Sequence, residues 1–384
     1  MMSRFAKLIR GFAVTALLSL TASGPALAAT FVYVSNAEDG DISTYAMQPD
    51  GTLRAGARVP AAKLVMPMAT SPDKRFLYAA SRSKPYAVHA YTIDRSSGAL
   101  TPLPTSPLAD SMPFISLDRT GRFLFGASYG GHVVSVNVVG ADGRVADAPL
   151  QVIPVGRNAH SIRIDASNRF VFVPVLGTDQ IFQFLFDANS GRLTSNTPAV
   201  VLMKPGTGPR HFILSRDNRF AYVLSELRAI VTTYALDQDS GLLTEVSSTS
   251  GLPPDSRLGP GAPRVPVGSS NAAPRNTEND IWAADIHVTP DGRFLYISER
   301  TGSTIEAFSV DEATGHLARL GSVPTEMQPR GFAIDPGGKF LVASGEKSDT
   351  ISVYSIDQSN GSLHLLRKYP VGKGANWVEI VGFE

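Results

Sequence analysis

One short pattern, a basic residue followed by phenylalanine, recurs along most of this 384-residue chain. Its six copies are Arg75-Phe76, Arg122-Phe123, Arg169-Phe170, Arg219-Phe220, Arg293-Phe294 and Lys339-Phe340. When the related Phe31 is counted as the first copy, successive phenylalanines lie 45, 47, 47, 50, 74 and 46 residues apart. A nearly constant period of this length predicts a closed ring or an array built from one supersecondary unit.

A second pattern, a turn glycine with an apolar residue shortly after it, has the same period. The seven copies are Gly51, Gly98, Gly143, Gly191, Gly241, Gly315 and Gly361. Their spacings are 47, 45, 48, 50, 74 and 46 residues, so the two patterns stay in step along the whole chain. Both patterns therefore indicate seven units.

Within a unit the residues alternate with the period of a strand. Residues 76–79 (FLYA) are followed by a break, then by residues 88–93 (VHAYTI), then by a turn that ends at Gly98. Repeated antiparallel sheets of about 45 to 50 residues are the sequence signature of a β-propeller. A parallel sheet is excluded because no segments are available as crossover helices. The fold class predicted is all-β, a seven-bladed β-propeller.

The two ends of the repeat region are incomplete in complementary ways. Phe31 begins a pattern that belongs to the second strand of a unit, so the first unit lacks its innermost strand. Residues 377–381 (WVEIV) form a strand pattern that remains after the seventh unit. We therefore expect the N- and C-terminal strands to share one blade and close the ring.

The 74-residue spacing contains an insertion of about 25 residues. Residues 251–277 are rich in Pro, Gly, Ser and Asn and are typical of a surface loop. Because this loop joins the outer strand of one blade to the inner strand of the next, it should emerge on the face where such connections gather. Residues 29–384 are thus predicted to be a single propeller domain with one loop insertion at about 251–277.

The first 28 residues resemble an export signal. They contain three basic residues, an apolar run from Phe12 to Leu20, and small residues that end in Ala26-Leu27-Ala28. The apolar run is about half the roughly 20 residues that a membrane-spanning helix needs, so cleavage after Ala28 is predicted. The chain has no Cys, and a bacterial periplasm fits this pattern best, with full secretion as the alternative.

The net charge gives no support for binding nucleic acid. The formal charge is +1, and removal of residues 1–28, with three basic and no acidic residues, leaves −2. A basic excess is the usual footprint of a nucleic-acid surface, and none exists here. We expect neither a nucleic-acid partner nor membrane attachment after removal of the signal, and the oligomeric state is left open.

Comparison of the repeats with one another identifies two positions with unusual chemistry. Ten residues before the marker phenylalanine the copies have Met66, Pro113, His160, Arg210, Ala284 and Arg330. Six residues after it they have Ala37, Arg82, Tyr129, Leu176, Glu226, Arg300 and Glu346. These two positions start the innermost strand and end its antiparallel neighbour, so both should lie at one end of the central channel. Their charged side chains should therefore converge.

A cluster of this kind is compatible with a purely structural role or with a metal site. Polar residues commonly line propeller channels, and the Arg and Glu side chains could simply neutralise one another across water. A metal held by Asp285, Glu226 and Glu346 is also conceivable, although nearby arginines would oppose a cation, and no metal is expected. Of Asp285 and His287, we expect one to face the channel and the other a neighbouring blade.

Several blocks of sequence resemble the seven-bladed propeller lactonases, the family of the bacterial propeller-type 6-phosphogluconolactonase and the fungal carboxymuconate lactonising enzymes. The resemblance covers about residues 30–384. The most specific blocks are residues 208–211 (GPRH), 226–227 (EL), 282–293 (WAADIHVTPDGR), 324–332 (PTEMQPRGF) and 371–372 (VG). By this resemblance His160, Arg210, Glu226 and Arg300 carry the active site, the residues that the repeat comparison also singles out.

The resemblance implies hydrolysis of a sugar lactone without a cofactor. In this mechanism water attacks the carbonyl, Glu226 is the candidate base, His160 the proton donor, and the two roles could be exchanged. Arg210 and Arg300 would stabilise the oxyanion and then the product carboxylate. Further substrate-binding residues are expected to be Asp285, His287, Arg330, His211 and Glu346.

The export signal bears on which lactone is cleaved. A phosphorylated lactone is made inside the cell, whereas periplasmic glucose oxidation yields unphosphorylated D-glucono-1,5-lactone, which is therefore the favoured substrate. The alternatives are 6-phosphogluconolactone, a non-catalytic propeller that binds a sugar acid or a protein partner, and reversible cycloisomerisation of a muconate. Folds do not fix functions, so the binding module belongs among these alternatives.

Overall fold

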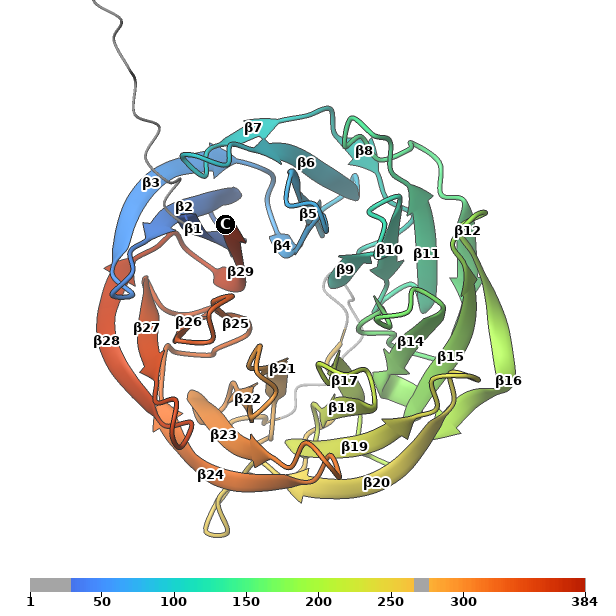
Figure 1. Ribbon diagram of the computed structural model, residues 1–384, viewed down its shortest axis with the longest axis vertical. Helices are drawn as coiled ribbons and strands as arrows, with labels where there is room; N and C mark the ends of the chain where they lie inside the picture. Colours follow the sequence, from blue (N-terminus) through green and yellow to red (C-terminus); the bar gives the residue numbers. More distant parts are fainter. Residues whose placement is uncertain (1–28, 266–275, 384) are drawn as a thin grey trace, which may run out of the picture.

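The computed structural model describes residues 29–265 and 276–383, which form seven sheets arranged radially around a central axis (Figure 1). The predicted export segment, residues 1–28, lies outside the described residues. Within the described part of the chain the only helical element is the short 3-10 turn η1 (Leu176–Thr178), and no helix is long and apolar enough to cross a bilayer. The prediction of an all-β, seven-bladed propeller is confirmed.

The blades are antiparallel sheets whose strands run in order from the channel outwards. Blade 1 consists of β29 (Ala375–Phe383), β1 (Ala29–Asn36), β2 (Asp41–Met47) and β3 (Leu53–Pro60). Blade 2 consists of β4 (Val65–Thr70), β5 (Phe76–Ser81), β6 (Ala87–Ile93) and β7 (Leu100–Pro102), with β8 (Ser106–Pro107) also paired to β6. Blade 3 consists of β9 (Phe114–Leu117), β10 (Phe123–Ala127), β11 (Val133–Val138) and β12 (Gln151–Pro154).

The remaining four blades repeat the same order. Blade 4 consists of β13 (Arg163–Ile164), β14 (Phe170–Val175), β15 (Gln180–Asp187) and β16 (Arg192–Leu202). Blade 5 consists of β17 (Pro209–Leu214), β18 (Phe220–Ser225), β19 (Ile230–Leu236) and β20 (Leu243–Ser250). Blade 6 consists of β21 (Ala283–Val288), β22 (Phe294–Glu299), β23 (Thr304–Val310) and β24 (Leu317–Pro324). Blade 7 consists of β25 (Phe332–Ile334), β26 (Phe340–Ser344), β27 (Thr350–Ile356) and β28 (Leu363–Pro370).

The ring is closed by the two ends of the described chain. Strand β29 pairs antiparallel with β1, from Ala29 opposite Phe383 to Asn36 opposite Ala375. The C-terminal strand therefore supplies the innermost strand of the blade that the N-terminal strand begins. This is the arrangement that the incomplete first and last repeats predict.

The two sequence patterns meet in space, between neighbouring blades. Each marker phenylalanine lies against the turn glycine of the next blade, and Phe340 of blade 7 lies against Gly51 of blade 1. In the five Arg-Phe copies the guanidinium also lies over the ring, 4.8 to 5.4 Å from its centroid. The phenylalanine and glycine patterns therefore recur because the same contact between them is made at each junction of two blades.

Candidate functional site

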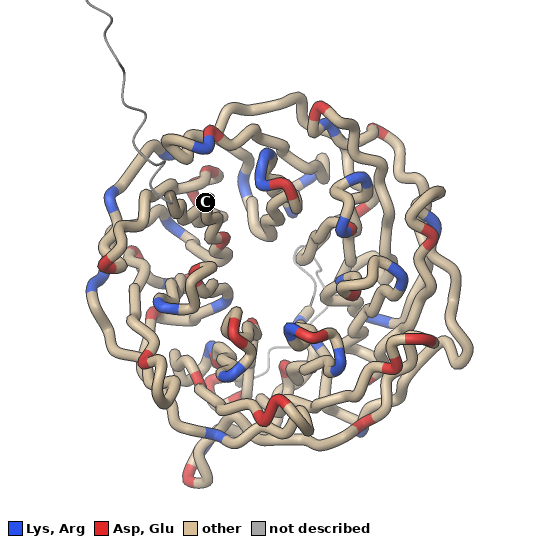
Figure 2. The backbone as a smooth tube through the Cα atoms, in the orientation of Figure 1, with Lys and Arg blue, Asp and Glu red and all other residues tan. Residues whose placement is uncertain are grey.

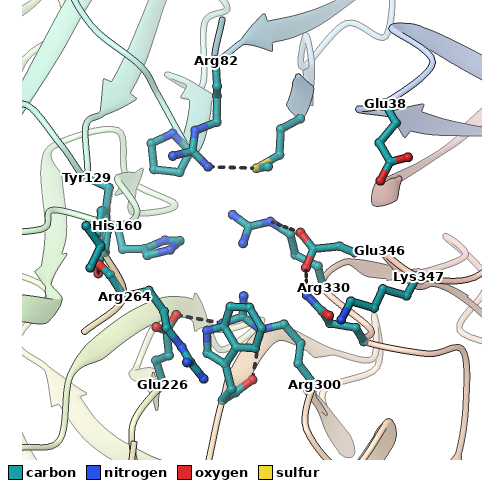
Figure 3. A pocket seen from close by; sticks show the side chains of 15 residues that line it. Glu38, Arg82, Tyr129, His160, Glu226, Arg264, Arg300, Arg330, Glu346 and Lys347 are labelled. Atoms are coloured by element: carbon teal, nitrogen blue, oxygen red, sulfur yellow. Dashed lines mark hydrogen bonds and ion pairs between the residues drawn. The ribbon is translucent and has the colours of Figure 1, made fainter. Parts of the chain in front are cut away.

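A cavity of about 450 Å³ lies at one mouth of the central channel. Both sequence positions that carry unusual chemistry contribute to it, through Met66, Pro113, His160, Arg330, Arg82, Tyr129, Glu226, Arg300 and Glu346. The other residues that line it are Glu38, Arg264, Val265, Trp282, Gln328 and Lys347. Figure 2 shows positive and negative residues around the central opening, and Figure 3 shows the labelled side chains converging on the cavity. The side chains converge as the repeat comparison predicts.

The Glu226 carboxylate is held by two guanidinium groups. Its Oε2 accepts a hydrogen bond from Arg210 Nε at 2.8 Å and another from Arg300 Nη2 at 2.9 Å. All three side chains are nearly inaccessible to solvent, so these charge-assisted bonds are little screened. They fix the orientation of a carboxylate that faces the cavity, with both charge-assisted bonds on one of its two oxygens.

Arg210 lies behind Glu226 and does not line the cavity. Its side chain is fully buried on β17, and its Nη1 donates to the carbonyl oxygen of Ala284 in blade 6. Arg210 thus joins blades 5 and 6 beneath the site. This position suits it to orient Glu226, whereas Arg300 reaches the cavity itself.

Arg300 is fixed from three directions. It donates to the carbonyl oxygens of Trp282 at 3.0 Å and Ala283 at 3.1 Å, in addition to Glu226. Its guanidinium carbon also lies 3.7 Å from the centroid of the Trp282 ring. Burial lowers the pKa of Arg300 to about 10, so the side chain stays cationic at neutral pH. The site therefore presents a rigid positive charge next to Glu226.

His160 faces the same cavity from blade 4. Its ring packs edge-on against Tyr129, with centroids 5.6 Å apart, and against His211 at 5.1 Å. Burial lowers the pKa of His160 well below its ordinary value, and the neighbouring Arg210 charge lowers it further. His160 is therefore a neutral imidazole at pH 7, and its buried Nδ1 has no hydrogen-bond partner among the described residues.

A second group of charges lies across the cavity. Arg330 Nε lies 3.9 Å from Glu346 Oε1, and Glu346 Oε2 accepts a hydrogen bond from Gln328 at 2.7 Å. Within the described part of the chain, the buried Nε and Nη2 of Arg330 have no hydrogen-bond partner. Arg82 lies on the same rim, and burial lowers its pKa to about 10, still above neutral pH. Arg330 therefore has free donors for a bound oxygen atom.

Three of the predicted substrate-binding residues lie beneath the cavity and do not line it. Asp285 is buried on β21 and accepts a hydrogen bond from His211 Nδ1 at 2.9 Å and one from His287 Nε2 at 3.2 Å. Burial by itself raises the pKa of Asp285, but the two histidines outweigh it and hold the pKa well below its usual range. The network supports the floor of the site.

One prediction about this network was wrong. We expected Asp285 and His287 to point in different directions, one to the channel and one to a neighbouring blade. The two side chains hydrogen-bond each other, so they lie on the same side of β21. The reason is elementary, because residues two apart on a strand share a face.

The carboxylates considered as metal ligands are not gathered into a ligand set. Glu226 is paired with Arg210 and Arg300, and Asp285 is paired with two histidines. Glu346 faces Arg330. Over residues 29–265 and 276–383, no group of three or more His, Asp or Glu side chains is placed to hold a metal ion.

The insertion contributes residues that the repeat comparison missed. Arg264 and Val265 belong to the described part of the predicted loop and line the cavity. Trp282 also lines it, and the guanidinium groups of Arg264 and Arg300 both lie over its ring. No repeat position marks Arg264, because the other six units have nothing equivalent. Residues 266–275 of the predicted loop lie outside the described residues.

Comparison with known proteins identifies a family. The model of the family described as "Lactonase, 7-bladed beta-propeller" matches residues 31–380. The 6-phosphogluconolactonase of Serratia proteamaculans is 39% identical over 350 residues, which cover 91% of this chain and 98% of that protein. The 6-phosphogluconolactonase of Pectobacterium carotovorum is 39% identical over 353 residues, 92% and 99% of the two chains.

Among solved structures, the periplasmic gluconolactonase of Pseudomonas aeruginosa matches with a TM-score of 0.78 and 27% identity. The match covers 92% of this chain and 99% of that one. The similarity therefore extends over the whole ring and includes all seven blades.

Proposed function

The chain belongs to the lactonase family of seven-bladed β-propellers, and we propose that it hydrolyses a sugar lactone, D-glucono-1,5-lactone, to gluconate. A lactone hydrolase is what the family indicates, and the particular lactone is our proposal. The observation that carries it is the Glu226 carboxylate, fixed by two guanidinium groups and facing a cavity that His160 also lines. A proton donor, His160, a base, Glu226, and a cation, Arg300, thus line the same cavity.

Glu226 acts as the base in the proposed reaction. Its Oε2 is occupied by Arg210 and Arg300, which leaves Oε1 to take a proton from a water molecule. That water attacks the lactone carbonyl carbon, and the carbonyl oxygen becomes an oxyanion. Arg210 is given a positioning role here, since it is buried behind the carboxylate.

The oxyanion is stabilised by Arg300 and Arg330. Arg300 is already held rigidly by Trp282 and Glu226, so it loses little freedom when charge develops nearby. Arg330 offers buried N–H groups that have no acceptor among the described residues. The same two guanidinium groups then bind the carboxylate of the product, whose geometry they match.

His160 donates a proton to the ring oxygen as the ring opens. Because His160 is neutral at pH 7, it supplies this proton as a relay: its free nitrogen gains the proton that Glu226 took from water while its other nitrogen releases one. In the reverse assignment the free nitrogen of His160 takes the proton from water and the imidazolium so formed supplies the proton for the ring oxygen, while Glu226 stays a carboxylate between Arg210 and Arg300. Asp285, His287 and His211 support the floor beneath these groups, and Glu346 holds Gln328 at the rim.

The predicted export signal supports an unphosphorylated substrate and a periplasmic location. A protein that leaves the cytoplasm meets the products of periplasmic sugar oxidation. The gluconolactonase from Pseudomonas aeruginosa, which shares the fold, is described as periplasmic. We therefore propose that this protein acts in the periplasm on D-glucono-1,5-lactone.

A second candidate substrate is 6-phosphogluconolactone. The cavity also contains Arg82 and Lys347, which lie at a distance from Glu226 in Figure 3, and such cations suit a phosphate group. The two relatives from Serratia and Pectobacterium are named for this substrate. Direct comparison of the two lactones therefore belongs in the same assay.

The test is proton release at constant pH from purified residues 29–384, corrected for spontaneous hydrolysis. We expect the Glu226→Gln variant to lose about 100-fold or more of the enzymatic rate. Glu245→Gln, the same change on the exposed face of β20, is the matched control and should keep full activity. No acceleration of either lactone would overturn the proposal. Gluconate binding without turnover would then favour a binding module, and turnover of a muconolactone would favour the cycloisomerase.

A further inference from the structure

The described part of the insertion follows a fixed path along the edge of the site. Gly259 N donates to the Asn279 carbonyl and Ile281 N donates to the Gly259 carbonyl, both at 2.8 Å. Gly261 N donates to the carbonyl of Leu227, the neighbour of Glu226, at 2.9 Å. A Cβ added at Gly261 would overlap the Ile281 carbonyl oxygen. The backbone of the insertion is therefore pressed against blades 5 and 6.

Tyr129 of a neighbouring part of the rim holds the end of this segment. Its hydroxyl donates to the carbonyl oxygen of Arg264 at 2.8 Å, although the two residues are 135 positions apart and Tyr129 belongs to blade 3. The Tyr129 ring packs against His160, so the same side chain contacts a proposed catalytic residue. The backbone of Arg264 is therefore held by Tyr129, and the nearby Gly261 is held by Leu227, so both contacts fix Arg264 next to the site.

The Arg264 side chain is directed to the cavity with donor capacity left over. Its guanidinium carbon lies 4.4 Å from the centroid of the Trp282 ring, which Arg300 also covers. Its Nη2 lies 3.9 Å from Asp280 Oδ2, too far for a hydrogen bond. Its buried Nε has no hydrogen-bond partner within the described residues. Figure 3 shows Arg264 on the same side of the cavity as Glu226 and His160.

We propose that Arg264 is a substrate-binding residue that the insertion supplies to the site. Its free N–H groups donate to hydroxyl oxygens of the sugar lactone, away from the carbonyl that Arg300 and Arg330 serve. The stack on Trp282 keeps the planar guanidinium in a fixed orientation, so Arg264 contributes to binding in the ground state and the transition state alike. The insertion therefore helps to determine which lactones are held over Glu226. This inference rests on the proposed function for the identity of the substrate.

The test compares Arg264→Ala, Arg264→Lys and Arg257→Ala. Arg257 is an exposed arginine of the same insertion that does not line the cavity, so it is the matched control. We expect Arg264→Ala to raise KM for D-glucono-1,5-lactone about 10-fold with kcat nearly unchanged, because uniform binding is lost. Arg264→Lys keeps the charge but loses the planar stack, so its KM should lie between those of Arg264→Ala and the unaltered protein.

Gluconate binding, measured by titration calorimetry at a temperature where all variants have the same circular dichroism spectrum, separates this inference from the proposed function. We expect its Kd to rise about 10-fold in Arg264→Ala and to stay unchanged in Arg257→Ala. If the unaltered protein binds gluconate in this Arg264-dependent way without turning over lactone, the proposed function fails and the inference stands. An unchanged KM and Kd in Arg264→Ala, an equal effect of Arg257→Ala, or no gluconate binding at all would overturn the inference.

Discussion

The ring of Phe170 in blade 4 lies directly on Gly241, in the turn between β19 and β20 of blade 5. The same contact occurs at all seven blade junctions, so the two repeating patterns in the sequence are its two halves. Neighbouring blades share no strand pairing in the described residues, so side-chain contacts of this kind contribute to holding them together. The glycine is needed because a side chain would occupy the space that the ring fills.

We predict that Gly241→Ala destabilises the protein by about 3 kcal/mol. The residue has φ of +72°, which a Cβ makes unfavourable by about 1 kcal/mol. The added Cβ would also lie within 3.0 Å of the Phe170 ring, and such overpacking costs about 1 to 3 kcal/mol. The urea midpoint of unfolding and the Tm measure the effect.

Gly292→Ala is the matched control for the backbone contribution. Gly292 has φ of +85°, yet the nearest atom to an added Cβ is a flexible Glu312 carboxylate oxygen at 3.6 Å. We expect it to lose only about 1 kcal/mol. Equal losses in the two variants would show that the Phe170 contact contributes nothing.

Removal of residues 375–384 should prevent formation of a stable ring. It deletes β29, which pairs with β1 along the whole length of that strand and packs Trp377 and Val381 into the core. The unpaired edge of β1 would be open to pairing with another chain, a common route to aggregation. Size-exclusion chromatography should find aggregates in place of a monomer-sized peak. A soluble species with the Tm of the full chain would contradict this prediction.

The sequence predicted the ring, its seven blades and its closure, because these features follow from the period and from Phe31 and residues 377–381. It did not predict the divided outer edge of blade 2. There β7 ends at Pro102, Pro104 follows, and β8 pairs separately with β6. Proline has no N–H to donate, so the outer strand is interrupted at a point that period-two alternation does not reveal.

Loss of the buried cation behind Glu226 should cost both stability and activity. We predict that Arg210→Met destabilises the protein by about 3 kcal/mol, since it removes one of two charges that compensate a buried carboxylate. The kcat should fall because Glu226 is then held by Arg300 alone. Chemical denaturation and the lactone assay measure the two effects.

Arg58→Met provides the comparison at the surface. Arg58 forms ion pairs with Asp39 and Asp41, and its side chain is 48% exposed. Screening by water makes such pairs worth about 0 to 1 kcal/mol, and kcat should not change. A loss in Arg210→Met no greater than in Arg58→Met would contradict a special role for the buried pair.

The candidate site was predictable where the repeat carries it and not elsewhere. His160, Glu226, Arg300, Arg330 and Glu346 all come from the two repeat positions, so the convergence of the strands in the ring brings them together. The depth of each side chain could not be predicted in this way. Arg210 occupies the same repeat position as His160 and Arg330, but its side chain is turned inward to Glu226. Contributions from the insertion depend on contacts such as that of Tyr129 with Arg264, which no period encodes.

The rate of lactone hydrolysis should show no inflection near pH 6.5. Burial, together with the charge of Arg210 and the proximity of His211, Arg330 and Arg300, lowers the pKa of His160. A lowered pKa means that the imidazole gains a proton only well below the ordinary value of about 6.5. The neutral form therefore persists from pH 8 to pH 6, and the rate over this range should stay constant after correction for spontaneous hydrolysis.

The Arg210→Met variant should shift the pKa of His160 upward. Removal of the Arg210 charge takes away one cause of the lowered pKa, so protonation of His160 should begin at a higher pH than in the unaltered protein. The loss of activity on acidification should shift upward by the same amount. Nuclear magnetic resonance titration of the His160 ring checks the assignment directly. An inflection near pH 6.5 in the unaltered protein would show that His160 titrates like an exposed histidine. That result would contradict the proposal that a neutral His160 transfers the proton.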